Sequence, residues 1–264
     1  MNGRRPTRPR ALGAALVLAG LLVGAAVALV LLGPSSGPSS ADPVLPASPR
    51  SALAPENVPL GPRPVAYWAP VLTAEAARQR PAGPGVVADV PARTPEGTTN
   101  IVLVLGQAER KGGKLWVRVR APGSPEDVGG WMPRAALGGY TPVRTRLVVD
   151  RERRTATLLR DARPVFRAAV AIGAPATPTP TGDFYVRNQL NRYRSPFYGP
   201  VAFGTSARSP GASDWPAGGF VGIHGTNRPD LIPGPVSAGC IRMTNRDILR
   251  LARLMRVGTP LSIR

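Results

Sequence analysis

One cysteine and one histidine occur in the whole chain of 264 residues, and both lie in one short segment. His224 precedes Cys240 by 16 positions. A thiol is a modest nucleophile near neutral pH unless a neighbouring group favours its thiolate form. An imidazole can take up that proton and return it later at the same pH. The two residue types are therefore those that a cysteine nucleophile and its histidine base require.

Glycine next to the cysteine adds to this interpretation. Gly239, directly before Cys240, would let a substrate approach the backbone closely because it has no side chain. The backbone N–H groups of Gly239 and Cys240 could then hold the oxyanion that develops in acyl transfer. A structural interpretation also stays open, because a lone free cysteine is commonly a small buried hydrophobe. Separation in sequence gives no direct measure of separation in space, so residue types alone do not decide between the two.

Composition excludes several other kinds of protein. One cysteine excludes an internal disulfide, and one cysteine with one histidine leaves too few ligands for an ordinary zinc site. We therefore expect Cys240 to act as a thiol and not as a zinc ligand, and the activity inferred below implies no metal and no cofactor. The formal net charge is +19, from 34 Lys and Arg against 15 Asp and Glu. These charges are spread along the chain without a nucleic-acid-binding motif, so we expect an anionic cell envelope as the partner and no nucleic acid.

Segment 223–243 resembles the signature of the L,D-transpeptidase catalytic domain, also called the YkuD domain. That signature is a His-Gly pair, a spacer of about this length, and then Ser-His-Gly-Cys followed by Ile-Arg or a similar pair. The matching residues are His224-Gly225 and Ser237-Ala238-Gly239-Cys240-Ile241-Arg242. Upstream, 178–184 and 195–200 also resemble the turn and strand of that family, so the resemblance covers about 120 residues.

The resemblance implies a fold and a set of roles. The expected fold is mainly β, a YkuD-type β-sandwich with a short C-terminal helix, in which Cys240 and His224 share one cleft. Cys240 would be the nucleophile and His224 the general base. The main-chain carbonyl of Gly225 would orient the imidazole, and Gly239 would contribute to the oxyanion hole.

Three further positions follow from the same resemblance. Arg242 lies where the family keeps a polar or basic residue near the substrate, and its alternative is a structural arginine that bonds loop carbonyls. Tyr198 either lines the acyl-donor groove or packs, and we favour packing. The family's second histidine, directly before the Gly-Cys pair, is Ala238 here. That histidine is not the base in the implied mechanism, so the departure bears on rate and on the preferred acceptor.

The activity that the resemblance implies is L,D-transpeptidation of peptidoglycan. Cys240 would attack the carbonyl of the third residue of a tetrapeptide stem, and the thioester would pass to an amine of another stem, which gives a 3→3 cross-link. Two alternatives stay open, an L,D-carboxypeptidase in which water takes the acyl group and a non-catalytic wall-binding protein. The expected partners are peptidoglycan stem peptides, with β-lactams of the carbapenem type as covalent inhibitors.

The N-terminus predicts how such a site would reach the wall. Residues 1–10 carry four arginines and no acidic residue, and 11–32 is an unbroken apolar run. As a helix, this run would span about 33 Å, which matches a bilayer core of roughly 30 Å. We expect 1–10 to be cytoplasmic, 11–32 to be a single-pass membrane anchor, and the remainder to be extracytoplasmic. The alternative is a cleaved signal peptide and a secreted protein.

The remaining chain divides into three parts. Residues 33–63 are rich in Pro and Ser and predict an extended linker. Residues 64–140 predict a small SH3-like β domain, and 143–264 the catalytic domain. The predicted strands are 101–105, 115–120, one opening at 130–133, 147–149, 156–159, 165–172, 183–186, 220–223 and 261–263. Thr244-x-x-Asp247 resembles a capping box before a single amphipathic helix.

Overall fold

The structure is a computed structural model of the chain. It describes residues 65–110, 114–123, 129–191, 195–209, 211, 215 and 219–264. The predicted cytoplasmic segment 1–10, the membrane anchor 11–32 and the linker 33–63 lie outside the described residues. Within the described residues, no helix is long and apolar enough to cross a membrane.

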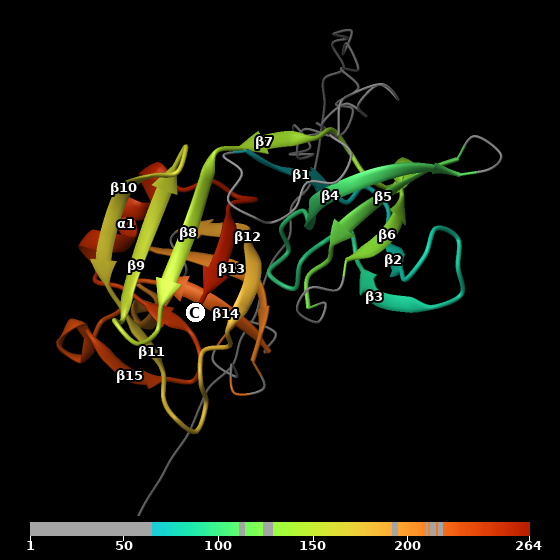
Figure 1. Cartoon of the computed structure of the whole chain (residues 1–264). Helices are drawn as coiled ribbons and strands as arrows, with labels where there is room; N and C mark the ends of the chain where they lie inside the picture. Colours follow the sequence, from blue (N-terminus) through green and yellow to red (C-terminus); the bar gives the residue numbers. More distant parts are fainter. Residues whose placement is uncertain are drawn as a thin grey trace, which may run out of the picture. The chain divides into compact units, whose positions relative to one another are not determined.

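Seven strands form the first sheet, in the spatial order β3-β2-β6-β5-β4-β1-β7 (Figure 1). Their bounds are β1 Ala66–Pro70, β2 Glu75–Arg78, β3 Val86–Val90, β4 Ile101–Arg110, β5 Lys114–Arg120, β6 Gly130–Pro133 and β7 Thr141–Val143. A 3-10 turn, Arg134–Ala136, follows β6. The three strands predicted here are confirmed as β4, β5 and β6. Strands β1 to β3 were not predicted, because they are short and β2 reads EAAR, which has no β-branched or aromatic residue.

Ten strands form the second sheet, in the order β10-β9-β8-β17-β12-β13-β14-β16-β11-β15. Their bounds are β8 Thr145–Asp150, β9 Thr155–Arg160, β10 Arg163–Ala169, β11 Ala171–Gly173, β12 Gly182–Asn191, β13 Val201–Arg208, β14 Phe220–His224, β15 Gly234–Ser237, β16 Ile241–Arg242 and β17 Pro260–Ile263. One α-helix among the described residues, α1 (Asn245–Leu254), follows β16. The predicted mainly β fold with one short C-terminal helix is thus confirmed.

Alternating burial explains the regular strands. In β8, Leu147 and Val149 are fully buried while their neighbours are half-buried, and β9 buries Ala156 and Leu158 in the same way. This period of two is that of a strand with one face on a core. Ile248 of α1 packs on the same core. The predicted strands at 147–149 and 156–159 are confirmed, and they pair as an antiparallel hairpin.

The capping box that begins α1 is also confirmed. Thr244 is the N-cap residue, and its Oγ1 accepts the backbone N–H of Asp247 at 3.1 Å. The same hydroxyl donates to the Asp247 carboxylate at 2.8 Å. The cap satisfies one of the free N–H groups at the helix start.

One predicted strand is divided in two. The run 165–172 is not a single strand, because β10 ends at Ala169 and β11 starts at Ala171 in a different part of the sheet. Val170 lies between them, and its N–H donates to the carbonyl of Arg154 at 2.9 Å. The apolar residues continue through this change of direction, so the pattern alone does not reveal it.

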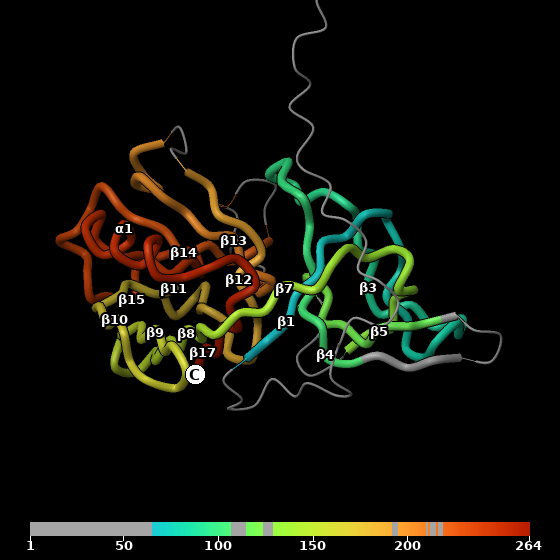
Figure 2. The backbone as a smooth tube through the Cα atoms, turned by 90° about the horizontal axis from the view of Figure 1, so that it is seen from above, coloured from blue at the N-terminus to red at the C-terminus, as the bar shows by residue number. Residues whose placement is uncertain are grey.

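Strand β12 connects the two halves of the second sheet. Its residues 182–185 pair with β17, and its residues from Val186 onward pair with β13. The face of β12 away from the main core contacts the first sheet, where Tyr185 Oη donates to the carbonyl of Ile101 at 2.9 Å. Figure 2 shows the two sheets side by side, with β7 leading from the first to β8 of the second.

Candidate active site

Strand register brings the histidine and the cysteine to neighbouring strands. β14 and β16 are parallel, with Ile223 opposite Ile241 and His224 opposite Arg242. Both isoleucines are fully buried in the main core. Because successive side chains of a strand point to opposite faces, His224 and Arg242 point away from that core.

Cys240 lies on the same face as His224. It directly precedes Ile241, and its Sγ accepts the backbone N–H of Gly222, two residues before His224, at 3.3 Å. Its side chain belongs to a separate apolar cluster with Ala202, which is the residue paired with His224 across β13 and β14. The two residues that are 16 positions apart in sequence are therefore diagonal neighbours on one face of the sheet.

The imidazole of His224 is held in one tautomer. Its Nδ1 lies 2.6 Å from the carbonyl oxygen of Gly225. A carbonyl only accepts, so Nδ1 carries the proton and Nε2 keeps its lone pair. Nε2 is buried and has no hydrogen-bond partner among the described residues. The structure thus places the predicted base and the predicted orienting carbonyl in direct contact, with the basic nitrogen available.

Burial keeps this imidazole neutral. His224 is fully buried, and burial lowers its pKa to about 4. The hydrogen bond to Gly225 opposes this effect, and the positive charge of Arg242 adds to it. At neutral pH the ring is therefore an unprotonated base and not an imidazolium.

We expect a nuclear magnetic resonance titration to give a pKa near 4 for the histidine of the full-length, untagged chain. His224 is the only histidine, so its ring signals need no assignment by mutation. Because an unfolded histidine takes up its proton near pH 6.5, the free energy of unfolding should also fall as the pH drops from about 6.5 to 4. A titration midpoint near the ordinary histidine pKa of about 6.5, with a free energy of unfolding that does not change between pH 6.5 and 4, would contradict the buried neutral ring.

The turn before the cysteine depends on Ser237 and Gly239. Ser237 Oγ donates to the carbonyl of Cys240 at 2.6 Å and accepts the N–H of Gly239 at 3.1 Å. Gly239 has φ +116°, a conformation that favours glycine. Its N–H is already bonded to Ser237, so a bound oxyanion would compete with the serine for it. The contribution of Gly239 to an oxyanion hole stays a prediction.

The loop after the histidine is held by the first residue of α1. Asn245 Oδ1 accepts the N–H of Thr226 at 3.0 Å. The same oxygen lies where a side chain on Gly225 or on Gly199 would have to be placed. Gly199 also has φ +67°. The helix start therefore fixes the backbone carbonyl that orients His224.

Aromatic rings cover the histidine. Tyr198 is 7% exposed, and its ring packs edge-to-face on the imidazole with 4.8 Å between centroids. The neighbouring Phe197 ring lies 6.0 Å from the imidazole and 4.4 Å from the guanidinium carbon of Arg242. Tyr198 therefore packs in this structure, as favoured above, and Arg242 makes a cation–π contact within the candidate site.

Ala238 does not take part in these contacts. It is half-buried, and neither the His224–Gly225 contact nor the Gly222–Cys240 contact uses its side chain. The two contacts that hold the pair therefore use backbone and side-chain atoms of other residues.

Sequence reasoning missed two residues next to the His224–Cys240 pair, Trp215 and its partner Glu96. Trp215 is 2% exposed and belongs to the same cluster as Cys240. Glu96 comes from the loop between β3 and β4 and accepts the indole N–H of Trp215 at 2.6 Å. No local pattern marks either residue, because their contact joins positions 119 apart in sequence.

The family model of the L,D-transpeptidase catalytic domain, YkuD, matches residues 144–263. Two curated relatives, both named "Putative L,D-transpeptidase YkuD", come from Bacillus subtilis and Bacillus licheniformis. They are 40% identical over 110 and 118 residues, which is 42% and 45% of this chain. The NMR structure of the catalytic domain from the E. faecium L,D-transpeptidase is 21% identical with a TM-score of 0.34, over 46% of this chain and 96% of that one.

These matches cover residues 144–263 and confirm the family resemblance that was inferred from the segment between His224 and Cys240. The matched part spans 60% and 64% of the two curated relatives. Residues 65–143, which include the whole first sheet, lie outside the family model.

Proposed function

We propose that this chain, whose residues 144–263 match the L,D-transpeptidase catalytic domain, is a cysteine acyltransferase that forms 3→3 cross-links between peptidoglycan stem peptides. The observation that carries the proposal is the face shared by His224 and Cys240 on neighbouring strands, with the Nε2 lone pair of the histidine free of any partner among the described residues. A thiol beside a neutral imidazole is equipped for nucleophilic acyl transfer.

In the first step, the Cys240 sulfur attacks the carbonyl carbon of the third residue of a tetrapeptide stem. His224 Nε2 takes the thiol proton as the C–S bond forms. The C–N bond to the terminal D-Ala then breaks, and the imidazolium returns the proton to the leaving amine. The products are free D-Ala and a thioester on Cys240.

In the second step, the side-chain amine of another stem attacks the thioester carbonyl. A C–N bond forms, the C–S bond breaks, and His224 passes the amine proton to the departing sulfur. Ala238, where the sequence departs from the family, bears on the preference for an amine over water as the acceptor. With water, the same site would act as an L,D-carboxypeptidase.

Four residues have supporting roles in this proposal. The Gly225 carbonyl holds the reactive tautomer of His224 and stabilises the imidazolium that forms. Gly239 and the adjoining N–H groups would receive the developing oxyanion. Arg242 and Tyr198 lie near the imidazole, where the charge of Arg242 adds to burial in favouring the neutral ring and Tyr198 packs on it. No metal or cofactor enters either step.

The location of the reaction is also a proposal. The apolar run 11–32 would anchor the chain in the cell membrane and leave residues 143–264 on the outer side, where stem peptides occur. Residues 64–140, which contain β1 to β6, would form an SH3-like domain that holds the catalytic domain at the wall.

Product analysis should reveal a cross-linked dimer. We expect the full-length chain, given a tetrapeptide donor whose own side-chain amine is blocked and a stem with a free side-chain amine, to release D-Ala and yield the dimer by mass spectrometry. Without the amine acceptor, dimer should be absent. Release of D-Ala with tripeptide as the only product in both reactions would instead assign the carboxypeptidase. No release of D-Ala from any stem would refute acyl transfer and favour a wall-binding protein.

A further inference from the structure

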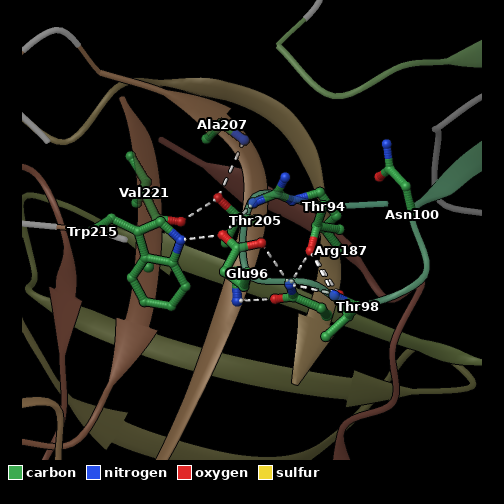
Figure 3. A network of polar contacts seen from close by, with 12 residues as sticks. Thr94, Glu96, Thr98, Asn100, Arg187, Thr205, Ala207, Trp215 and Val221 are labelled. Carbon is green, nitrogen blue, oxygen red and sulfur yellow. Dashed lines mark hydrogen bonds and ion pairs between the residues drawn. The ribbon is translucent and has the colours of Figure 1, made fainter. Parts of the chain in front are cut away.

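The carboxylate of Glu96, in the loop between β3 and β4 of the first sheet, is buried against β12 of the second sheet (Figure 3). Glu96 Oε1 accepts Arg187 Nη2 at 2.7 Å and Trp215 Nε1 at 2.6 Å, and Oε2 accepts Asn188 Nδ2 at 3.0 Å. The side chains of Glu96 and Arg187 are 2% and 1% exposed. A carboxylate removed from water to this extent is stable only when its oxygens are well bonded, and here three donors bind it.

The loop that carries Glu96 is held by its own hydrogen bonds. The N–H of Thr94 donates to the carbonyl of Thr98 at 2.8 Å, and the N–H of Gly97 donates to the carbonyl of Thr94 at 2.9 Å. The hydroxyls of Thr94 and Thr98 are 2.8 Å apart. Gly97 has φ +83°, which lets the tip of the loop turn back. The carboxylate is therefore presented by a closed, preorganised turn.

The receiving strand is adapted to this carboxylate. The pairing of β12 with β13 shifts between Val186 and Asn188, which leaves Arg187 without a partner in the ladder. Such a bulge redirects side chains that would otherwise alternate. As a result, two consecutive residues, Arg187 and Asn188, both reach Glu96. The guanidinium of Arg187 also lies 4.0 Å from the ring centroid of Phe220, the first residue of β14.

Glu96 stays ionised in this position. Burial raises its pKa, but the positive charge of Arg187 and the hydrogen bonds from Trp215 and Thr94 outweigh burial and hold the pKa below its usual value. The hydrogen bond to the indole is therefore charge-assisted, and such bonds are shorter and stronger than neutral ones. Glu96 thus holds Trp215 in one position.

Trp215 contacts the strand of the candidate base. Its ring lies so close to Gly222 that a side chain there would overlap it, and it is 3.3 Å from the position of a Cβ on Gly204. Gly222 is the residue whose N–H donates to Cys240 Sγ. The ring of Trp215 also packs edge-to-face on Tyr198, with 5.8 Å between centroids, and Tyr198 packs in turn on His224.

We propose that Glu96 is a positioning residue for the candidate active site, acting through Trp215 on the strand of Gly222 and His224 and so on the reactivity of Cys240. The catalytic meaning of this inference rests on the proposed function. It also assigns the first sheet a part in the chemistry, because the loop 91–100 that carries Glu96 connects two of its strands.

The test uses the reactivity of the only thiol. In the full-length chain, we expect Glu96→Gln and Trp215→Phe each to slow alkylation of Cys240 by iodoacetamide at pH 7 about tenfold. If Glu96 acts through Trp215, the double variant should be no slower than either single variant. The ring signals of His224 in an untagged chain should shift in both single variants, since the only histidine reports on its own surroundings.

Tyr185→Phe is the matched control. It removes another buried hydrogen bond between the same two sheets, from Tyr185 Oη to the carbonyl of Ile101, but it does not touch Trp215. The rate of alkylation should stay within twofold of the wild-type rate. The ring signals of His224 should not shift. An equal loss in this control would mean that any loosening between the sheets suffices, which would overturn the proposal.

Two other results would overturn it. One is an alkylation rate within twofold of wild type in folded Trp215→Phe, and the other is independent, additive losses in the double variant. Glu96→Gln leaves Arg187 buried with a neutral partner and can fail to fold. Trp215→Phe is then the decisive variant, because in it Glu96 keeps its hydrogen bonds with Arg187 and Asn188. Alkylation needs no peptide substrate, so absence of cross-linking activity would refute the proposed function and leave this test intact.

Discussion

Replacing Cys240 by Ala should abolish release of D-Ala from a tetrapeptide donor, with a loss on the order of 10⁴-fold or more. The variant loses the contact of the Gly222 N–H with Sγ but keeps the hydrogen bonds of Ser237 to the backbone of Gly239 and residue 240, so the site around position 240 should still fold. What it lacks is the only sulfur nucleophile of the chain. Turnover measured by D-Ala release, together with circular dichroism of the variant, gives the result.

A conservative variant and a control sharpen this prediction. Cys240→Ser places an oxygen where the sulfur was. A hydroxyl is far less acidic than a thiol, so this variant should be inactive beside a neutral imidazole. Val236→Ala, at an exposed position of β15, should retain full turnover. Residual turnover above one tenth of wild type in Cys240→Ala would assign the nucleophile to another residue.

Replacing His224 by Gln should lower the rate of acylation about 10³-fold at pH 7. The chain then lacks the group that takes the thiol proton, while Cys240 itself is unchanged. Hydroxide can still generate the thiolate, and an ordinary thiol titrates near pH 8.5. The rate of the variant should therefore rise about tenfold per pH unit up to that region, whereas the wild type, with its base already neutral, should not show this rise.

The pH dependence distinguishes a base from a structural histidine. If His224 only packs against Tyr198 and the Gly225 carbonyl, the variant should lose stability and turnover to the same degree at every pH. A flat, low profile in a folded variant would thus contradict the assignment. The measurement is the initial rate of D-Ala release between pH 6 and 9, together with the melting temperature at each pH.

The sequence predicted those elements whose local pattern suffices to define them. The alternation of Leu147 and Val149 gave β8, the cap at Thr244 gave the start of α1, and the apolar run before His224 gave β14. Within the candidate site, the family resemblance predicted the contact of His224 with the Gly225 carbonyl. Each of these features depends on residues within a few positions of one another.

Other elements depend on contacts that no local pattern contains. β13 is buried along nearly its whole length and so lacks the alternation that marks a half-buried strand. β16 has two residues and exists only because it lies between β14 and β11. Glu96 has its partners Arg187 and Trp215 at separations of 91 and 119 residues. The local sequence, Glu96 followed by Gly97, is typical of a solvated turn. Only the folded arrangement of the two sheets shows that the Glu96 side chain is buried.

The central claim is a thioester on Cys240, and intact mass spectrometry tests it most directly. The full-length chain, incubated with a carbapenem or with a tetrapeptide donor and no acceptor, should gain the mass of one acyl group. Fragmentation should place that mass on the peptide that contains Cys240, and Cys240→Ala should show no gain. An adduct that persists in Cys240→Ala, or that maps to another residue of the wild type, would contradict the account.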